Sequence, residues 1–452
     1  EASLRRATHY DFWSDSLRRS ILLDAKADLL VYGMAERALL EIAQRLEAAE
    51  ESAREVKSFS GVLNGIPGTV YAGRETDLPV ESRIITLPSH EEIQADPRAL
   101  LTATMELEDQ VHQGSAWAVQ RTGDRLVILT PPADPLTTEE MDRLYNLPFT
   151  RTPHPTYRET IPAMEMLAAS VTTHRGCGGG CAFCSLALHQ GRRISSRSDR
   201  SIVDEVHRLT GAPQWRGSLS DVGGPSANMW GAVCARGNDR CRRPSCLVPE
   251  ICRHFRVDQD GMVGLLRTLK NIPGVEHVRV ASGLRHDLAL TAPKALKALV
   301  SEFVGGQLKV APEHSSDRVL KLMRKPGIRV FEKFMDFFQK ESRRAGKEQY
   351  LVPYLLSALP GCTDADMKSL ADWLKERSWR PRQVQCFIPT PGTLATAMYF
   401  AGESSDGQPI FVARTDAQRQ RQHRIFGLPK EESGGKRVIG RKGIKSRRRE
   451  DE

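Results

Sequence analysis

Three cysteines at C-x3-C-x2-C spacing are the residues of this chain best suited to chemistry. Cys177, Cys181 and Cys184 stand on a short stretch in which three glycines separate the first two. Thiolates ligate soft metals, and a Gly-rich backbone can fold tightly around a metal. Three such ligands can hold three corners of a cubane iron–sulfur cluster that normally takes four, which leaves one iron open. The spacing also fits a structural zinc site completed by His174 or His189, or unligated core thiols.

A second set of cysteines lies downstream in an Arg- and Pro-rich stretch. Cys234, Cys241, Cys246 and Cys252 are few residues apart and poorly placed for a core. Four thiolates can close a tetrahedral zinc site or hold an auxiliary iron–sulfur cluster, although the spacing matches no common zinc finger. Reduced structural thiols are the alternative. The arginines between these cysteines would offset thiolate charge or present a basic patch to an acidic partner.

Alternating strands and helices must position the first cysteine set. From about residue 161 the pattern repeats strand, loop and helix, which is typical of a parallel sheet. The predicted strands cover residues 167–172, 217–221, 278–282, 307–311, 350–356 and 383–388. Helix-like stretches between them include residues 199–210, 292–303 and 332–345. The cysteine loop directly follows the first of these strands.

The first 160 residues predict an incomplete α/β region without a catalytic constellation. Residues 28–32 form a short apolar run suited to a buried strand, and residues 35–49 follow with helical periodicity. Residues 65–73 suggest another strand, and residues 116–130 a hairpin in which Gly123 supplies the turn.

Longer motifs give the chain a family resemblance. The cysteine loop is similar to that of radical S-adenosylmethionine (SAM) enzymes. Five further motifs resemble the YgiQ-like, UPF0313-type radical SAM family over most of the chain: SDVGGPSANMWG, ASGLRHDL, LKVAPEHSS, LSALPGCT and FIPTPGTLATAMYF. The resemblance implies a partial (β/α)6 barrel over residues 161–402, with a Cys-rich insertion at 226–256. An incomplete Rossmann-like α/β region would precede it over residues 1–160, and the family pattern implies further chain ahead of Glu1.

The resemblance also implies the chemistry. Cys177, Cys181 and Cys184 would hold a [4Fe–4S] cluster whose open iron binds SAM. An electron from a donor such as flavodoxin or ferredoxin would cleave SAM into methionine and a 5′-deoxyadenosyl radical, which abstracts hydrogen from an unknown substrate. A cobalamin-assisted radical methyltransferase is a close variant of this function, but the chain has no Asp-x-His-x-x-Gly cobalamin motif.

Candidate SAM-binding residues follow the second and third predicted strands. Gly223, Gly224 and Pro225 stand where relatives carry Gly-Gly-Glu, whose backbone receives the SAM amino group. Glycines permit close approach of a ligand to the backbone, but Pro225 replaces the acidic residue, so a carboxylate contact is lost there. A plain Gly-Pro turn is the alternative.

The third predicted strand ends in Ser282 and Gly283, which we expect near the SAM ribose or carboxylate. Arg285 could pair with a carboxylate through its forked guanidinium. Glu313 and His314 end the fourth strand, where they could bind SAM or move a proton. A hydrogen-bonded structural pair is the alternative for Glu313 and His314.

Composition limits the remaining possibilities. No apolar run approaches the ~18 residues of a membrane span, and nine clustered cysteines favour a reducing, cytoplasmic environment over a disulfide framework. The net charge of +9 gathers toward the C-terminus, where residues 403–452 predict a basic, disordered tail. The rival function is a zinc-stabilised nucleic-acid-binding protein without catalysis. An aromatic content of 6% and no recognisable RNA-binding module argue against nucleic acid as a partner.

Overall fold

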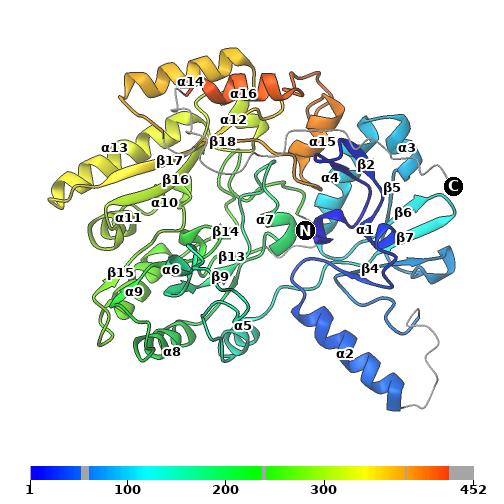
Figure 1. Cartoon of the computed structure of the whole chain (residues 1–452), viewed down its shortest axis with the longest axis horizontal. Coiled ribbons are helices and arrows are strands. Elements are labelled where there is room, and N and C mark those ends of the chain that lie inside the picture. The colour runs from blue at the N-terminus through cyan, green and yellow to red at the C-terminus, as the bar shows by residue number, and fades with distance from the viewer. Residues whose placement is uncertain (1, 52–60, 237–240, 382–383, 427–452) are drawn as a thin grey trace, which may run out of the picture.

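A five-stranded sheet organises the N-terminal part of the chain (Figure 1). The computed structural model describes residues 2–51, 61–236, 241–381 and 384–426. The sheet order is β3-β4-β7-β6-β5, in which β5 and β6 are parallel and the other neighbours antiparallel. Its strands are β3 (Leu30–Val31), β4 (Thr69–Gly73), β5 (Ile84–Leu87), β6 (Trp117–Thr122) and β7 (Arg125–Leu129).

This mixed sheet corrects the expectation of a Rossmann-like region. A Rossmann-like sheet is mostly parallel and is built with helical crossovers. Here the predicted hairpin forms instead, because Gly123 at φ +55° turns β6 back onto β7. A smaller antiparallel ribbon of β1 (His9–Asp11) and β2 (Ser16–Arg18) precedes the sheet, followed by helix α1 (Ile21–Asp24).

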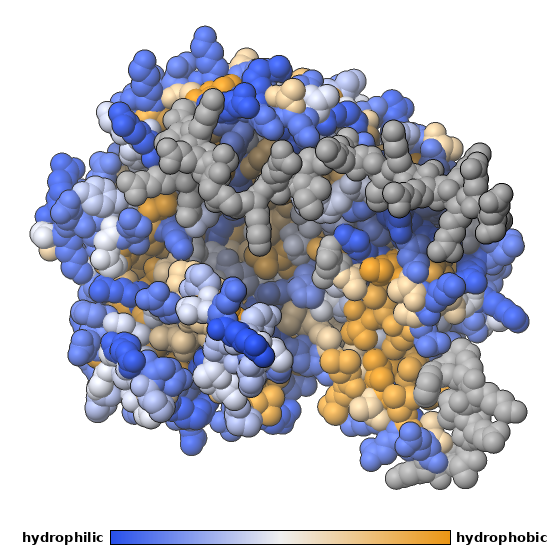
Figure 2. Space-filling view, in the orientation of Figure 1, coloured by the Kyte–Doolittle hydropathy of each residue, from blue (hydrophilic) through white to orange (hydrophobic). Residues whose placement is uncertain are grey.

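Helices α2 (Glu36–Glu51), α3 (His90–Ala95), α4 (Arg98–Gln113) and α5 (Thr138–Tyr145) accompany the sheet. The predicted apolar face of α2 is only partly buried. Ile42 and Leu46 pack against buried Leu63 and Ile66, whereas the Leu39 side chain is 56% exposed. An apolar surface on the side of the molecule where α2 lies is visible in Figure 2.

A succession of parallel strands runs through the rest of the described chain, as predicted. Two short antiparallel pairs accompany it: β9 (His174–Arg175) with β10 (Ser195–Ser196), and β13 (Val233–Cys234) with β14 (Phe255–Arg256). β8 (Ser170–Thr172) pairs with β12 (Asp221–Gly223), and β11 (Ser218–Leu219) pairs with β15 (His277–Val278), both in parallel. A parallel bridge from Leu284 to Val310 leads to β16 (Gln307–Glu313), which continues to β17 (Tyr350–Ser357) and β18 (Val384–Cys386). Strands adjacent in the sequence are therefore adjacent in space.

The observed strands differ from the predicted ones in their boundaries. The first begins late, because Met164–Leu167 forms helix α6 and β8 starts only at Ser170. The second is interrupted at Ser220, which separates β11 from β12. It ends at Gly223, two residues later than predicted. The third, predicted over residues 278–282, is only β15 (His277–Val278), so Ser282 and Gly283 lie in the segment after it. The fourth, β16, runs two residues further than predicted and ends at Glu313.

Helices cover this succession of strands and bury its apolar residues. Helix α8 (Asp199–Thr210) has the predicted boundaries, because Ser198 caps its first turn through a hydrogen bond to the Ser201 amide. The other helices are α9 (Gln259–Lys270), α10 (His286–Ala289), α11 (Pro293–Ala298, continued by a π-helical turn at Leu299–Phe303), α12 (Asp317–Leu322), α13 (Ile328–Arg344), α14 (Asp364–Glu376) and α15 (Leu394–Ala401). Their apolar faces form two large clusters with the strands. No helix in the described ranges is long and apolar enough to cross a membrane.

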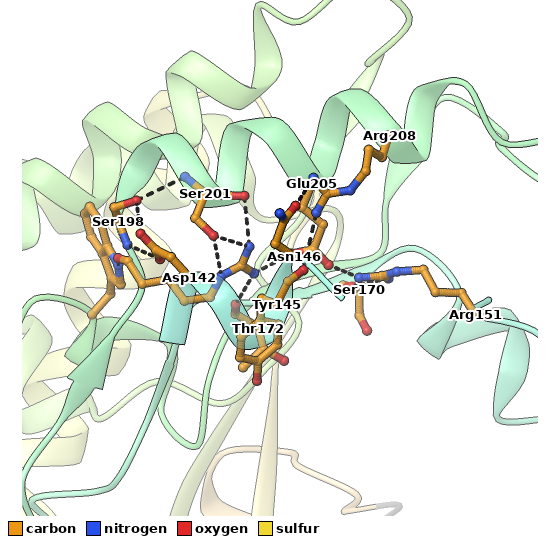
Figure 3. A network of polar contacts seen from close by, with 12 residues as sticks. Asp142, Tyr145, Asn146, Arg151, Ser170, Thr172, Ser198, Ser201, Glu205 and Arg208 are labelled. Carbon is orange, nitrogen blue, oxygen red and sulfur yellow. Dashed lines mark hydrogen bonds and ion pairs between the residues drawn. The ribbon is translucent and has the colours of Figure 1, made fainter. Parts of the chain in front are cut away.

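The N-terminal region contacts both ends of the strand succession. At the end formed by β8, Glu205 of α8 makes ion pairs with Arg151 and with fully buried Arg197 (Figure 3). Asp142 of α5 accepts hydrogen bonds from the amide and hydroxyl of Ser198, at 3.0 and 2.6 Å. At the other end, α4 packs against α15.

The expected C-terminal tail is partly ordered. Residues 416–424 form helix α16 (Asp416–Arg424), although the sequence predicted disorder from residue 403. Polar contacts hold this helix: Gln422 donates to the carbonyl of Cys362 at 2.8 Å and accepts from the amide of Ala358 at 2.9 Å. Because the helix lacks an apolar periodicity, hydrophobic patterning could not reveal it. The prediction for residues 427–452 lies outside the described residues.

Candidate functional site

The cysteine loop runs from β9 (His174–Arg175) to α7 (Leu186–Gln190) and is anchored on several sides. The Cys177 amide donates to the carbonyl of Gly191 at 3.1 Å. Ala182 donates to the carbonyl of Met323 at 3.0 Å and accepts from the amide of Ala395 at 2.9 Å. The loop therefore rests on the segment after α7 and on the segments near α12 and α15.

Two sulfurs of the first cysteine set, those of Cys177 and Cys181, lie next to Gly179, and the Cys184 amide donates to the carbonyl of Cys181 at 3.1 Å. A Cβ atom placed on Gly179 would lie 3.3 Å from Cys177 Sγ and 3.7 Å from Cys181 Sγ, so a side chain there would crowd both sulfurs. Burial, together with the charge of neighbouring Cys181 and Cys177, raises the pKa of the Cys184 thiol to about 12. A bound metal cation would stabilise the thiolate forms of these cysteines.

Two buried cations lie beside these sulfurs. Arg285 Nη1 donates to Cys181 Sγ at 3.6 Å. Lys325 is 7% exposed and acts with Arg285 to oppose the rise in the pKa of Cys177, which burial causes. The donor set therefore fits an anionic thiolate cluster: three sulfurs on one loop, with fixed positive charge next to them.

Arg285 is held by a different partner from the one predicted. Its guanidinium makes a forked ion pair with Asp287, with Nε–Oδ1 at 3.0 Å and Nη2–Oδ2 at 2.5 Å. Burial disfavours the charged Asp287, but Arg285 outweighs it and lowers the pKa of that carboxyl to about 2. Asn228 fixes the Arg285 backbone by accepting from its amide and donating to its carbonyl, each at 3.0 Å. Nε and Nη2 of Arg285 are therefore already paired with Asp287, and Nη1 faces the Cys181 sulfur.

The structure brings together the residues that follow the second and third strands. A Cβ on Gly223 would lie 2.9 Å from the Ser282 hydroxyl, and the Ala227 amide donates to the carbonyl of Gly283 at 3.1 Å. Gly224, next to Pro225, packs equally closely against His174, whose carbonyl oxygen a Cβ would approach to 2.7 Å.

Asp221, which the sequence reasoning did not single out, orders this edge. Its Oδ1 accepts from the amides of Ala281 and Ser282, at 2.7 and 2.9 Å, and its Oδ2 accepts from the Ser282 hydroxyl. Asp221 is the first residue of β12 and stands two residues before Gly223. A carboxylate at the end of a buried strand was the signal that could have identified it.

Glu313 and His314 have different surroundings and do not act as a pair. Glu313 has a left-handed backbone (φ +69°) and its carboxylate is 3.4 Å from Lys325 Nζ, on the side of the first cysteine set. His314 is fully buried; its Nδ1 accepts from the Ser316 amide at 3.0 Å and its Nε2 lies 3.6 Å from Cys362 Sγ. Burial lowers the pKa of His314 to about 4.

A single bound ion finds no support in either cysteine set. Among the residues that the structure describes, no three His, Cys, Asp or Glu side chains are close enough to hold one metal ion. Thiolates around one zinc lie about 3.8 Å apart, as its tetrahedral Zn–S bonds require. Ligands of a multi-iron cubane are farther apart, because each binds a different iron. Among the described residues neither His174 nor His189 forms such a group with the cysteines; His174 Nδ1 bonds the Thr173 hydroxyl and His189 Nδ1 lies 3.3 Å from the Ser3 hydroxyl.

Comparison with known proteins gives concordant similarities. Residues 1–170 match the family model described as Radical SAM N-terminal. A UPF0313 protein of Geobacter sulfurreducens is 47% identical over 431 residues, which cover 94% of this chain and 70% of the relative. A UPF0313 protein of Rhodopseudomonas palustris is 46% identical over 418 residues, covering 89% of this chain and 62% of the relative. The chain thus spans 62–70% of the length of these relatives.

Solved structures are more distant. The radical S-adenosylmethionine methyltransferase TsrM from Kitasatospora setae, solved with cobalamin and a [4Fe–4S] cluster bound, is 14% identical with a TM-score of 0.42. The match covers 83% of this chain and 54% of that one.

Proposed function

The chain belongs to the UPF0313 family, and on that premise we propose that it is a radical SAM enzyme that cleaves SAM reductively at a [4Fe–4S] cluster. Cys177, Cys181 and Cys184 would hold the cluster. The observation that carries this proposal is the arrangement of the three cysteines beside the buried cation Arg285: Cys177 and Cys181 have their sulfurs next to Gly179, and the Cys184 amide donates to the carbonyl of Cys181. An anionic cluster on three ligands has its charge offset there and keeps an iron open for SAM.

When bound, the cluster and SAM supply the electron transfer and the carbon radical. The residues of the chain bind, orient and exclude water. Arg285 and Lys325 stabilise thiolate charge, and Asp287 and Glu313 hold these two cations in place. Such fixed charges in a dry site need no rearrangement when the electron arrives.

The edge formed by Gly223, Ser282 and Gly283 is the proposed SAM site. Its backbone is close-packed and ordered by Asp221, so its polar groups are fixed in advance. Pro225 offers no carboxylate to the SAM amino group, which leaves the backbone around Gly223 and Gly224 as the acceptor. A flavodoxin or ferredoxin is the proposed electron donor.

We infer that the parallel succession from β8 to β18 is a partial (β/α)6 barrel. Its six strand positions follow one another in sequence order, with helices between them. The N-terminal region contacts both ends of this succession, through α5 at one end and α4 at the other. The cysteine loop and Glu313 then share the carboxyl ends of the strands, where such barrels carry chemistry.

Anaerobic reconstitution tests the function. We expect the purified protein to bind iron and sulfide, to be brown, and to release 5′-deoxyadenosine when reduced in the presence of SAM. Cys177→Ala, Cys181→Ala and Cys184→Ala should each abolish that release, whereas Cys386→Ala, outside both cysteine sets, should not. Colourless protein with stoichiometric zinc would instead support the zinc-stabilised nucleic-acid-binding alternative.

A further inference from the structure

The Cys-rich insertion lies directly on the loop that carries the first cysteine set. The Cys246 amide donates to the carbonyl of Gly178 at 2.9 Å, and the Ser245 hydroxyl donates to the carbonyl of Gly179 at 2.5 Å. A Cβ on Gly178 would also meet Cys246 Cβ at 3.3 Å. The two cysteine sets are therefore neighbours in space.

The second cysteine set surrounds part of one pocket. Cys234, Cys241 and Cys246 line a pocket of about 280 Å³, together with residues that follow α7 and residues of the N-terminal region. Cys252 is held next to Cys246, because its amide donates to the carbonyl of Cys246 at 2.7 Å. No disulfide joins any of these cysteines. Three of the four cysteines thus line a space much larger than one metal ion, and the fourth is tied to one of them by its backbone.

A buried cation lines the same pocket. Arg192 is 9% exposed, and one of its terminal nitrogens donates to the carbonyl of Arg243. Its Nε is buried without a hydrogen-bond partner. A buried guanidinium with an unused donor is costly unless an anion faces it. Arg193, which also lines this pocket, already forms an ion pair with Asp134 at 2.9 Å.

The pocket therefore combines thiols with a buried cation. An occupant that suits both contains a soft metal, which thiolates ligate, and carries net negative charge when liganded. A zinc ion would need its four sulfurs about 3.8 Å apart, a grouping not found among the described residues.

We propose that Cys234, Cys241, Cys246 and Cys252 hold a second iron–sulfur cluster, whose negative charge Arg192 offsets. Four thiolates on a cubane leave no open iron, so this cluster is not a second SAM site. The proposal does not depend on the proposed function, because it concerns a different set of ligands.

Iron and sulfide analysis of the full chain, reconstituted without oxygen, tests the second cluster. We expect about eight irons and eight sulfides per chain, and about half of each in the Cys241→Ser/Cys246→Ser variant. The Cys177→Ala/Cys181→Ala/Cys184→Ala variant should keep the other half, and its reduced form should give an electron paramagnetic resonance signal from the second cluster alone. Cys386→Ser is the matched control and should retain all the iron.

The result that overturns the proposal is a full iron content in Cys241→Ser/Cys246→Ser, or one zinc per chain in place of the second half of the iron. The failure of the first site appears separately, as loss of the iron that the first three cysteines hold. Arg192→Met guards against a merely misfolded variant, because it keeps every ligand. It should retain the iron and shift the reduction potential of the second signal to lower values, whereas Arg192→Lys should restore it.

Discussion

The amide of Cys246 donates a 2.9 Å hydrogen bond to the carbonyl of Gly178, and this bond joins the insertion to the cysteine loop. The contact leaves little room between the two segments. Gly180 has a left-handed backbone (φ +62°), and a Cβ there would lie 2.1 Å from the carbonyl oxygen of Pro244. The glycines of the loop are thus required by the insertion as well as by a bound cluster.

Gly180→Ala should therefore separate the insertion from the loop. The Gly123→Ala variant is its matched control, since Gly123 has a similar left-handed backbone (φ +55°) with open space around it. We expect Gly123→Ala to lower the free energy of unfolding by about 1 kcal/mol through backbone strain alone. Gly180→Ala should cost about 1–3 kcal/mol more because of the clash. Urea unfolding measures both, and equal losses would show that Pro244 does not constrain the loop.

The Arg285–Asp287 pair gives a second prediction. Asp287→Asn leaves the charge of Arg285 buried without its counter-ion, which should lower the free energy of unfolding by about 3 kcal/mol. Glu302→Gln removes the carboxylate of the exposed Arg267–Glu302 pair and should cost at most about 1 kcal/mol. Denaturant unfolding of the two variants checks the difference, and similar small losses would mean that Arg285 is well solvated.

Local signals predicted much of the fold. Helix α8 was placed correctly because Ser198 caps it and its apolar residues Ile202, Val206 and Leu209 recur at helical spacing. The parallel strands were found because each is a short apolar run between helical stretches. Their boundaries were less certain: Leu167, apolar but helical, was assigned to a strand.

Contacts between distant segments could not be predicted in the same way. The hydrogen bond from Arg285 to Cys181 and the packing of the insertion on Gly178 join residues that share no sequence pattern. The Rossmann-like N-terminal region was predicted from the family resemblance. The sequence itself could not test this, because a strand–Gly–helix unit fits many topologies and only its neighbours decide the strand direction. Asp221 and Lys325 were overlooked because their roles are defined by partners elsewhere in the chain.

Glu313 and His314 should respond differently to matched substitutions. Glu313→Gln removes the negative charge beside Lys325 with little change in shape, and we expect formation of 5′-deoxyadenosine to fall by about tenfold or more. His314→Gln should leave that rate within a few-fold per folded molecule. It should instead lower the free energy of unfolding by about 1–3 kcal/mol, since a buried hydrogen-bonding group is disturbed.

Single-turnover assays on protein of known iron content distinguish these outcomes. Glu313→Gly serves as a second variant, because it relieves the left-handed backbone while still removing the carboxylate. It should be as inactive as Glu313→Gln. Activity lost in His314→Gln but retained in Glu313→Gln would reverse the two assignments.

Acid should destabilise the protein through its buried imidazoles. Burial lowers the pKa of His286 to about 3. The neighbouring Asp287 opposes this shift, whereas Lys325 and Arg285 add to it. Between about pH 6.5 and pH 3 the unfolded chain therefore binds a proton that the folded chain does not, so stability falls as the pH falls. Each such imidazole contributes a slope of about 1.4 kcal/mol per pH unit in that window.

His286→Leu removes one titrating group from an environment formed largely by Phe331 and Phe334, whose rings lie 5.3 and 6.1 Å away. We expect its free energy of unfolding to fall less steeply than that of the wild type between about pH 6.5 and pH 4.5. Exposed His207 is the control, and His207→Gln should leave the slope unchanged. Urea unfolding at a series of pH values measures both slopes. An unchanged slope in His286→Leu would mean that this imidazole takes up its proton without unfolding, and that acid acts through other groups.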